Sequence, residues 1–235
     1  MIPVTVLDSN LQPVAILEDY YSLLWPELYN EASNWTMELP VDHMYDVALS
    51  IGNFLTIKDS ERVMMIENLY PIFDEESGSK LVVEGTSAEI LLERRVLDDI
   101  WYVNGSVEIA VESLFYYAFL DVISVPDRSD PRMGFEYSLD PALEAITYAD
   151  IYDPDNLYIL IKTICKANDI GFKVVLSGDM FILKLYYGVD RSYDQNTEPF
   201  VVFSEDYDNL ISGSYYITAG GEKNIAIVLT DDAIY

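Results

Sequence analysis

Alternation of apolar and polar residues predicts short β-strands across the first hundred residues. Between Trp35 and Leu39 every second side chain is apolar, as in a strand that buries one face. Short apolar runs predict further strands at residues 4–7, 14–17, 54–57, 63–66, 70–73 and 80–83. Many short strands at close spacing are typical of a β-barrel or a β-sandwich.

Apolar residues at helical spacing begin at residue 86. The sequence Thr-Ser-Ala-Glu at residues 86–89 has the form of a capping box and predicts a helix that reaches Val96. A second helix is predicted from Ser106 to about Ile123, because its apolar residues fall near one face.

Aspartates that precede prolines mark two further helix starts, at Asp140 and Asp153. Apolar residues on one helical face follow the second start, and Gly171 is predicted to end that helix. Residues 172–176 and 180–187 then predict a hairpin. The last predicted strands are residues 201–203, 214–218 and 225–229.

Together these elements predict an α+β fold in which β structure dominates, with barrel-like β domains and inserted helices. A charged loop with prolines at residues 125–134 is the best candidate for a boundary or an insertion. We therefore expect a β-barrel-like domain over residues 1–97 and a helical and loop insertion over residues 98–150. A second α+β domain is expected over residues 151–235.

The charge of the chain excludes several classes of partner. Its 235 residues include 41 Asp and Glu but only 13 Lys and Arg, which gives a net charge of -28 at pH 7. Such a surface repels phosphates and therefore argues against ordinary binding to nucleic acid or to an anionic membrane. No apolar window approaches the ~20 residues of a membrane span, and the N-terminus lacks a secretory signal. We expect no membrane insertion.

The sequence contains no recognisable catalytic constellation. Cys165 stands alone in an apolar helical pattern, and His43 is the single histidine, so a zinc site or a Ser-His-Asp triad lacks partners. Glycine-rich nucleotide-binding motifs do not occur in the sequence. We therefore expect no enzyme activity, no catalytic residue, no metal ligand and no cofactor.

The densest group of oxygen ligands leaves Ca²⁺ binding as an alternative. Asp150, Asp153, Asp155 and Asn156 lie close in sequence but lack the loop glycine and the terminal Glu of an EF-hand. Helix capping explains Asp153 more simply. Binding of Ca²⁺ between chains stays open as an alternative.

Nineteen tyrosines and three tryptophans supply candidates for subunit contacts, because aromatic residues are enriched at interfaces. The clusters that we single out are Trp25 and Tyr29, which follow Tyr20 and Tyr21, and the pair Tyr215 and Tyr216. Strands also favour aromatic residues, so interface and core explain these clusters about equally well.

Two motifs near the end of the chain are the most specific feature of the sequence. They lie within residues 188–195 and 203–210. The residues that define them are Gly188, Asp190, Arg191, Ser192, Gln195, Phe203, Ser204, Asn209 and Leu210. Taken in order with residues 24–31, 34–40, 84–87 and 223–226, these motifs resemble the Gp37-like family of siphophage tail proteins.

The resemblance implies the fold of the baseplate hubs of phage tails and a structural role. Hubs of this kind assemble as a ring of three at the tail tip and form the conduit for DNA ejection. The implied partners are two further copies in a homotrimer, the distal tail protein, the tape-measure protein, and other tail-tip or receptor-binding proteins. The implied location is the virion, after synthesis in the host cytoplasm. An acidic channel wall lets DNA pass without specific binding, in agreement with the net charge.

The resemblance also implies roles for single residues. Arg191 is expected to make a charge-assisted hydrogen bond that fixes its loop, with Asp208 as a candidate partner. Asn209 is expected to satisfy backbone groups at a turn. Further strands are implied after residue 224, which leaves both a truncated chain and a minimal hub open.

Two functions from other classes stay open as alternatives. One is a hydrolase that acts on cell-wall glycans through acidic residues. The other is a carbohydrate-binding receptor module that uses exposed aromatic side chains.

Overall fold

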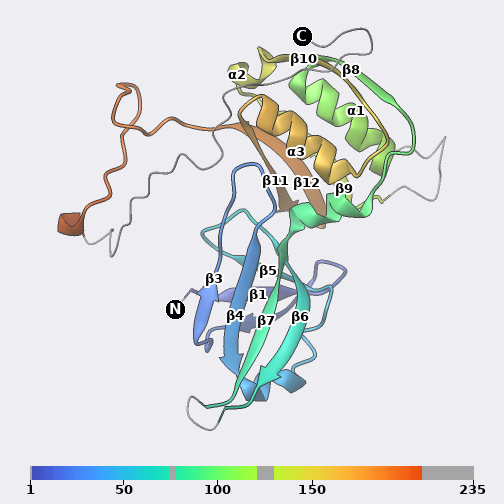
Figure 1. Ribbon diagram of the computed structural model, residues 1–235. Coiled ribbons are helices and arrows are strands. Elements are labelled where there is room, and N and C mark those ends of the chain that lie inside the picture. Colours follow the sequence, from blue (N-terminus) through green and yellow to red (C-terminus); the bar gives the residue numbers. More distant parts are fainter. Residues whose placement is uncertain (1, 75–77, 121–129, 208–235) are drawn as a thin grey trace, which may run out of the picture. The chain divides into compact units, whose positions relative to one another are not determined.

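The structure is a computed structural model that describes residues 2–74, 78–120 and 130–207. Its contacts divide the chain into two units, Met1–Gly188 and Val189–Tyr235. All of the described β-strands and α-helices lie in the first unit (Figure 1). In the second unit, the described residues are irregular apart from a short 3-10 helix, η4 (Glu205–Tyr207). The predicted division into three domains stays a prediction.

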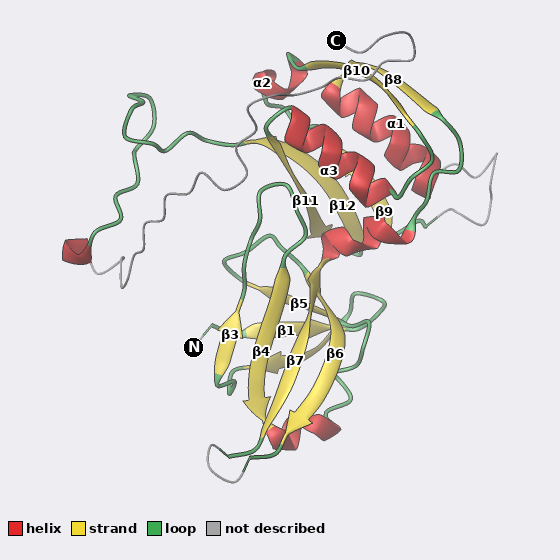
Figure 2. Cartoon of the chain, in the orientation of Figure 1, coloured by secondary structure: helices red, strands yellow, loops and turns green. Residues whose placement is uncertain are grey.

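An antiparallel sheet of seven strands forms one part of the first unit, with the order β2-β1-β5-β6-β7-β4-β3 (Figures 1 and 2). Its strands are β1 (Val4–Leu7), β2 (Pro13–Leu17), β3 (Ser22–Leu24), β4 (Asn34–Pro40), β5 (Phe54–Ile57), β6 (Met64–Ile72) and β7 (Lys80–Ser87). Among the described residues, β2 and β3 each pair with one neighbour only. The barrel-like part expected from the sequence is therefore a sheet that is not closed into a barrel, because closure requires the first and last strands to pair.

Strand β4 follows the alternation seen in the sequence. Trp35, Met37 and Leu39 are fully buried, whereas the residues between them are partly exposed. The strand pairs with β7 along its whole length, and the Trp35 indole Nε1 donates a hydrogen bond to the Met65 carbonyl oxygen at 3.0 Å. The alternation of apolar and polar residues in the sequence therefore predicted both the strand and the face that it buries.

Helices and short sheets form the rest of the first unit. Its elements are the two-stranded ribbon β8 (Trp101–Ser106) and β10 (Thr147–Tyr152), the helices α1 (Val107–Phe119), α2 (Pro141–Glu144) and α3 (Leu157–Ala167), and the sheet β11 (Ile170–Ser177), β12 (Met180–Tyr187) and β9 (Met133–Glu136). Helix α1 contacts the ribbon on one side and α3 on the other, and α3 packs on β11 (Figure 2). Strand β9 pairs with β12 in parallel.

Two hydrophobic cores hold the first unit together. The sheet core is formed by residues from β1 to β7 and their connections, namely Val4, Val6, Leu17, Tyr20, Trp35, Met37, Leu39, Leu49, Leu55, Met64, Ile66, Leu81 and Val83. The helix core joins the buried faces of α1, α3 and β11 to sheet residues such as Phe54 and Met65. Consecutive residues of a strand point to opposite faces, so Met64 and Met65 enter different cores. The predicted α+β class with dominant β structure is confirmed.

The first predicted helix is wrong. Residues 80–87 are strand β7, and only a 3-10 helix, η2 (Ala88–Arg94), follows. Ser87 makes no capping bond to η2; its hydroxyl oxygen instead accepts a hydrogen bond from the Ser33 backbone N–H at 2.9 Å. The two residues of the predicted capping box also make other contacts: the Thr86 hydroxyl donates to the Glu67 carboxylate at 2.7 Å, and Glu89 pairs with Arg62.

The predicted start at Ser106 is confirmed, since its hydroxyl oxygen accepts a hydrogen bond from the Ile109 N–H at the start of α1. Asp140 likewise caps α2, with Pro141 in the first turn. Asp153 does not begin a helix, because Asn156 caps α3 through the Tyr158 N–H at 2.9 Å.

The predicted stop of α3 at Gly171 is also wrong. Helix α3 ends at Ala167, and the chain reverses at Asp169, whose φ of 52° lies in the left-handed region. Gly171 belongs to β11, where an added Cβ would lie 2.4 Å from the Tyr186 ring. The glycine therefore permits close packing within the hairpin and does not end the helix.

The hairpin of β11 and β12 is confirmed, with Ser177 opposite Met180. The predicted strand at residues 201–203 is wrong, because this stretch has no strand pairing among the described residues. Residues 133–134, expected in a loop, begin β9. The predicted strands at 214–218 and 225–229 lie outside the described residues.

Candidate functional site

The first terminal motif begins at Gly188, where the chain leaves β12. Its backbone N–H donates a hydrogen bond to the Tyr29 hydroxyl at 2.8 Å. A Cβ on Gly188 would lie 3.0 Å from the same oxygen. Glycine therefore allows the backbone to approach Tyr29 closely.

The other residues of this motif form hydrogen bonds within their own loop. The Asp190 carboxylate accepts from the Ser192 backbone N–H at 2.8 Å, and this bond holds the pKa of Asp190 below its ordinary value. The Gln195 amide oxygen accepts from the N–H groups of Thr197 and Glu198 at 2.8 and 2.7 Å. These residues stabilise a loop, whereas their role in assembly stays a prediction.

Arg191 contacts the same loop. Its Nη1 donates to the Pro199 carbonyl oxygen at 3.3 Å, and its own carbonyl oxygen accepts from the Val201 N–H at 3.0 Å. The proposed partner Asp208 lies outside the described residues, so that pairing stays a prediction.

The second motif is described only in part. Phe203 is 70% exposed, and the Ser204 hydroxyl oxygen accepts from the Asp206 N–H at 3.1 Å. The remaining predicted residues of this region, Asn209, Leu210, Tyr215 and Tyr216, lie outside the described residues.

Tyr29 joins the segment before β4 to the β11–β12 hairpin. Its hydroxyl donates to the Asp169 carbonyl oxygen at 3.0 Å, and its own carbonyl oxygen accepts from the Tyr186 hydroxyl at 3.0 Å. The two rings meet edge to face, with centroids 5.3 Å apart. Burial raises the pKa of Tyr29. These contacts lie within one chain, and a subunit contact at Tyr29 stays a prediction.

Trp25, the other candidate of this cluster, also contacts its own chain. Its indole Nε1 donates to the Ser60 hydroxyl oxygen at 3.2 Å, and its half-buried ring packs against the sheet core. Ser60 in turn donates to the Glu27 carboxylate at 2.5 Å. The interface role of Trp25 also stays a prediction.

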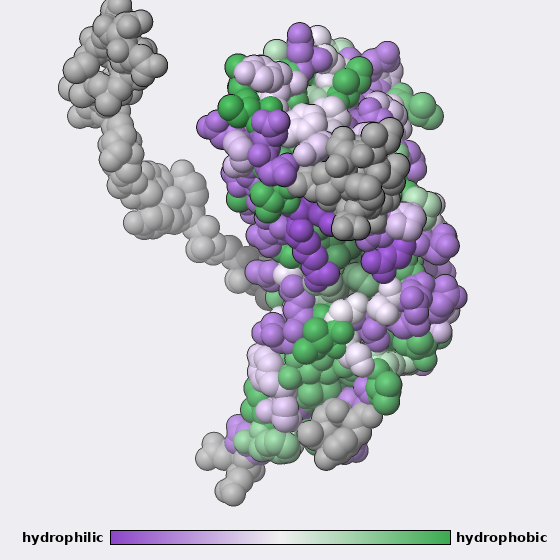
Figure 3. All heavy atoms as spheres, turned by 90° about the vertical axis from the view of Figure 1, so that its right-hand side faces the viewer, coloured by the Kyte–Doolittle hydropathy of each residue, from purple (hydrophilic) through white to green (hydrophobic). Residues whose placement is uncertain are grey.

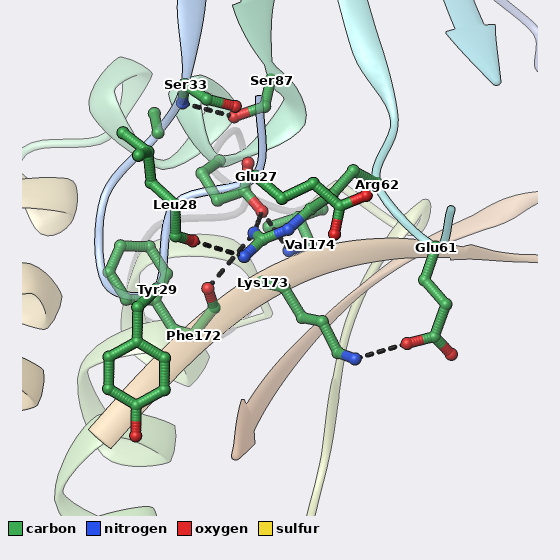
Figure 4. Close-up of polar contacts among 12 residues, drawn as sticks. Glu27, Leu28, Tyr29, Ser33, Glu61, Arg62, Ser87, Phe172, Lys173 and Val174 are labelled. Atoms are coloured by element: carbon green, nitrogen blue, oxygen red, sulfur yellow. Dashed lines mark hydrogen bonds and ion pairs between the residues drawn. The ribbon is translucent and has the colours of Figure 1, made fainter. Parts of the chain in front are cut away.

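A buried ion pair that the sequence pattern did not indicate lies beside Tyr29, and Figure 4 shows its arginine, Arg62, next to Leu28 and Phe172. Arg62, just before β6, pairs with Glu89 of η2, and the two side chains are 4% and 0% exposed. The same guanidinium donates to the carbonyl oxygens of Leu28 at 2.6 Å and Phe172 at 3.3 Å. The Glu89 Oε1 atom also accepts from the Val174 N–H at 2.8 Å. We call these contacts the Arg62–Glu89 junction.

The junction connects the seven-stranded sheet to strand β11, which is also bridged to Arg62 through Val175. The second Glu89 oxygen, Oε2, is buried without a hydrogen-bond partner among the described residues. Burying a charged pair is favourable only when its hydrogen bonds are nearly complete. The contacts that are formed make the junction a structural connection within the first unit.

The described residues hold no group of three or more His, Cys, Asp or Glu side chains placed to bind a metal ion. His43 contacts the Asp19 carboxylate through Nε2 at 3.0 Å. Cys165 is fully buried in the helix core, and burial raises the pKa of its thiol. A buried neutral thiol is a poor nucleophile. No helix within the described ranges has the length and apolar character needed to cross a membrane.

Exposed apolar side chains lie on the edge strands of the large sheet. Val14 and Ile16 on β2 are 48% and 66% exposed, and Leu24 on β3 is 62% exposed. On the face drawn in Figure 3, apolar residues also gather over the part of the chain that contains this sheet. Unpaired strand edges with apolar side chains are sites where another chain can add.

Comparison with known proteins identifies the family. The profile described as Siphovirus ReqiPepy6 Gp37-like protein matches residues 3–233. No curated protein matches the sequence significantly.

Three solved structures resemble the fold. Prophage tail protein gp18 from Listeria monocytogenes EGD-e is 13% identical, with a TM-score of 0.50 over 77% of this chain and 50% of that chain. A tail protein from Neisseria meningitidis MC58 is 13% identical, with a TM-score of 0.42 over 77% and 49%. The E. coli c3393 protein, a component of the type VI secretion system, is 8% identical, with a TM-score of 0.39 over 79% and 45%. The chain thus spans about half the length of these structures.

The likeness to the Listeria protein concerns the fold, which is that of a prophage tail protein. The family match extends over nearly the whole chain and includes both terminal motifs. The resemblance found in the sequence is thereby confirmed: the chain belongs to the family of Siphovirus ReqiPepy6 Gp37-like proteins.

Proposed function

We propose that this chain is a structural protein of a siphovirus tail and stands at the tail tip. The observation that carries the proposal is the family match over residues 3–233. The fold shared with a prophage tail protein supports it. The role is one of assembly and involves no catalysis.

The proposed assembly is a ring of three copies. A ring requires one surface of each copy to contact a different surface of the next copy. The large sheet offers two unlike edge strands, β2 and β3, each of which pairs with only one neighbour in the described part of the chain. The exposed side chains of Ile16 and Leu24 lie on these edges. The proposed further partners are the distal tail protein, the tape-measure protein and receptor-binding proteins.

The net charge supports a passage for DNA through such a ring. With a charge of -28 per copy, a channel wall of this chain repels phosphates and does not retain them. The proposed location is therefore the tail tip of the virion, with DNA in transit and no specific contact to it.

Light scattering tests the ring. The purified chain is expected at three times 26.8 kDa over a range of protein concentrations. Ile16→Lys and Leu24→Lys introduce a charge at either edge and are expected to give monomers of unchanged melting temperature. Leu139→Lys is the control, since Leu139 is 99% exposed and lies outside both edges.

Two results would count against the proposal. A wild-type chain that stays monomeric at every concentration contradicts self-assembly into a ring. Edge variants that remain trimeric contradict the placement of the contacts at β2 and β3, but they do not contradict assembly into a ring of three.

A further inference from the structure

Three arginines meet at one cavity of the first unit. The cavity has a volume of about 370 Å³ and lies between η2, the end of α1 and β9. The residues on which the argument depends are Arg94, Arg95, Arg132, Phe54, Phe119 and Phe181. We call this cavity the arginine pocket.

The concentration of positive charge is unusual for this chain. The sequence has 13 Lys and Arg against 41 Asp and Glu, yet three of the cations line one pocket, and Asp130 is the one acidic residue among its described lining residues. Arg132 is neutralised there, because its Nε and Nη2 atoms donate to the two Asp130 carboxylate oxygens, each at 3.2 Å.

The other two arginines form no such bidentate pair with the described residues, although the Arg95 charge also interacts with Asp130. Neither Arg94 nor Arg95 forms an ion pair with a carboxylate of the described residues. Arg94 donates through Nη2 to the Met65 sulfur at 3.2 Å, and a thioether is a weak acceptor. The Arg95 guanidinium lies 4.8 Å from the centre of the Phe119 ring. Both arginines line the cavity and have N–H donors for which the described residues provide no carboxylate ion pair.

The shape and charge of the pocket select its ligand. A guanidinium presents a planar fork of donors that matches a carboxylate or a phosphate. The aromatic walls add apolar surface, which favours an apolar group attached to the anion. A cavity of about 370 Å³ has room for a short segment with a few side chains, and its exposed arginine, Arg94, is accessible to another chain. The net charge of the chain disfavours a polyanion such as DNA.

We propose that the arginine pocket binds a segment of a partner protein in which a carboxylate side chain is flanked by apolar side chains. The carboxylate pairs with Arg94 and Arg95, and the apolar side chains pack against Phe54, Phe119 and Phe181. This site is separate from the strand edges and does not depend on ring formation.

Fluorescence anisotropy with the full chain tests the proposal. The probes are labelled, acetylated pentapeptide amides Ala-X-Glu-X-Ala, in which X is Phe, Leu or Tyr. At least one probe is expected to bind saturably, and replacing Glu by Gln in it should weaken binding about tenfold, the value of one charge-assisted hydrogen bond. The variant R94Q/R95Q should weaken binding by at least that factor. Lys58→Gln, a single-charge control at an exposed residue, should not.

Competition with small anions shows whether the pocket binds a peptide segment or a free organic acid. Inorganic phosphate and 4-phenylbutyrate are expected to displace the peptide only at much higher concentrations than unlabelled peptide. Displacement by 4-phenylbutyrate at the same concentration would overturn the partner segment in favour of a free organic acid. Absence of saturable peptide binding, or binding unchanged in R94Q/R95Q, would overturn the site.

Discussion

Arg62 connects three separate segments of the first unit through one side chain. Its guanidinium contacts η2, the segment before β4 and strand β11. Removing one partner of a buried pair leaves the other charge without compensation. The loss of folding free energy on removing Arg62 is therefore larger than the net contribution of the ion pair to stability.

We expect Arg62→Ala to lower the free energy of unfolding by about 3–5 kcal/mol, because Glu89 would stay buried as an unpaired charge. Urea denaturation followed by circular dichroism measures the change. Lys80→Ala is the control: its pair with Glu38 is about one-third exposed on both sides, and exposed pairs contribute at most about 1 kcal/mol. Equal effects of the two substitutions would contradict the structural role of the junction.

The Glu31 carboxylate makes the stability of the folded chain depend on pH. Hydrogen bonds from Lys166 and Lys162 hold the pKa of the Glu31 carboxyl below its ordinary value. A carboxylate with a lowered folded-state pKa stabilises the protein above its unfolded pKa, and this contribution is lost as pH falls through the folded value.

We therefore expect Glu31→Gln to melt at a lower temperature than the wild type at pH 7. The difference should shrink as pH drops below about 4.3, the ordinary pKa of glutamate. Calorimetry across this range measures it. Glu18, an exposed carboxylate for which the described residues provide no ion pair, is the control. A difference that does not shrink as pH falls below about 4.3 would refute the electrostatic explanation.

Strand β6 is the element on which both cores depend. It pairs with β5 and β7, and the two neighbours Met64 and Met65 enter the sheet core and the helix core. Its pairing with β7 shifts between Ile66 and Asn68, which is the mark of a β-bulge. Gly85 of β7 lies opposite this point.

We expect Gly85→Ala to destabilise the chain by about 3 kcal/mol, as in overpacked cores. A Cβ at this position would lie 2.0 Å from the Met65 carbonyl oxygen and 3.0 Å from the Glu67 nitrogen, and neither backbone atom can move alone. Thermal and urea unfolding measure the effect. Gly134→Ala is the control, since its Cβ would meet the flexible ends of Ile182 and Met180. If Gly134→Ala is the more damaging change, the bulge does not require glycine.

The net charge acts at the scale of the whole molecule. Copies that each carry -28 repel one another, and salt screens this repulsion, with a Debye length of about 30 Å at 0.01 M and about 8 Å at 0.15 M. Any self-assembly through apolar strand edges must overcome this repulsion.

We expect the average mass from light scattering to rise between about 10 and 150 mM NaCl, and we expect no retention of duplex DNA at either concentration. The measurement uses wild-type protein at fixed concentration. A mass that falls as salt is added would indicate that ion pairs, not apolar edges, hold the copies together.

Local signals were sufficient for several elements. The caps at Ser106 and Asp140 involve groups within three residues of each other, so the sequence alone predicted them correctly. The buried face of β4 and the β11–β12 hairpin followed from period-two alternation and a short turn. The family followed from ordered motifs that span the chain.

Other features depend on contacts between distant residues. Arg62 and Glu89 are 27 positions apart, and Ser87 uses its hydroxyl for Ser33, 54 positions away, instead of capping a helix. Sequence periodicity contains no information about such pairs. The ribbon strands β8 and β10 were missed for a similar reason, since their pairing spans the intervening helices.

The sequence alone determined the class of the fold, the main strands and two helix caps, because apolar periodicity and capping act over a few residues. It also determined the family and the excess of negative charge. Only the tertiary structure decided that the large sheet stays open, that Arg62 joins sheet and hairpin, and that three arginines share a pocket. These features depend on which distant segments pack together, and packing is settled by the chain as a whole.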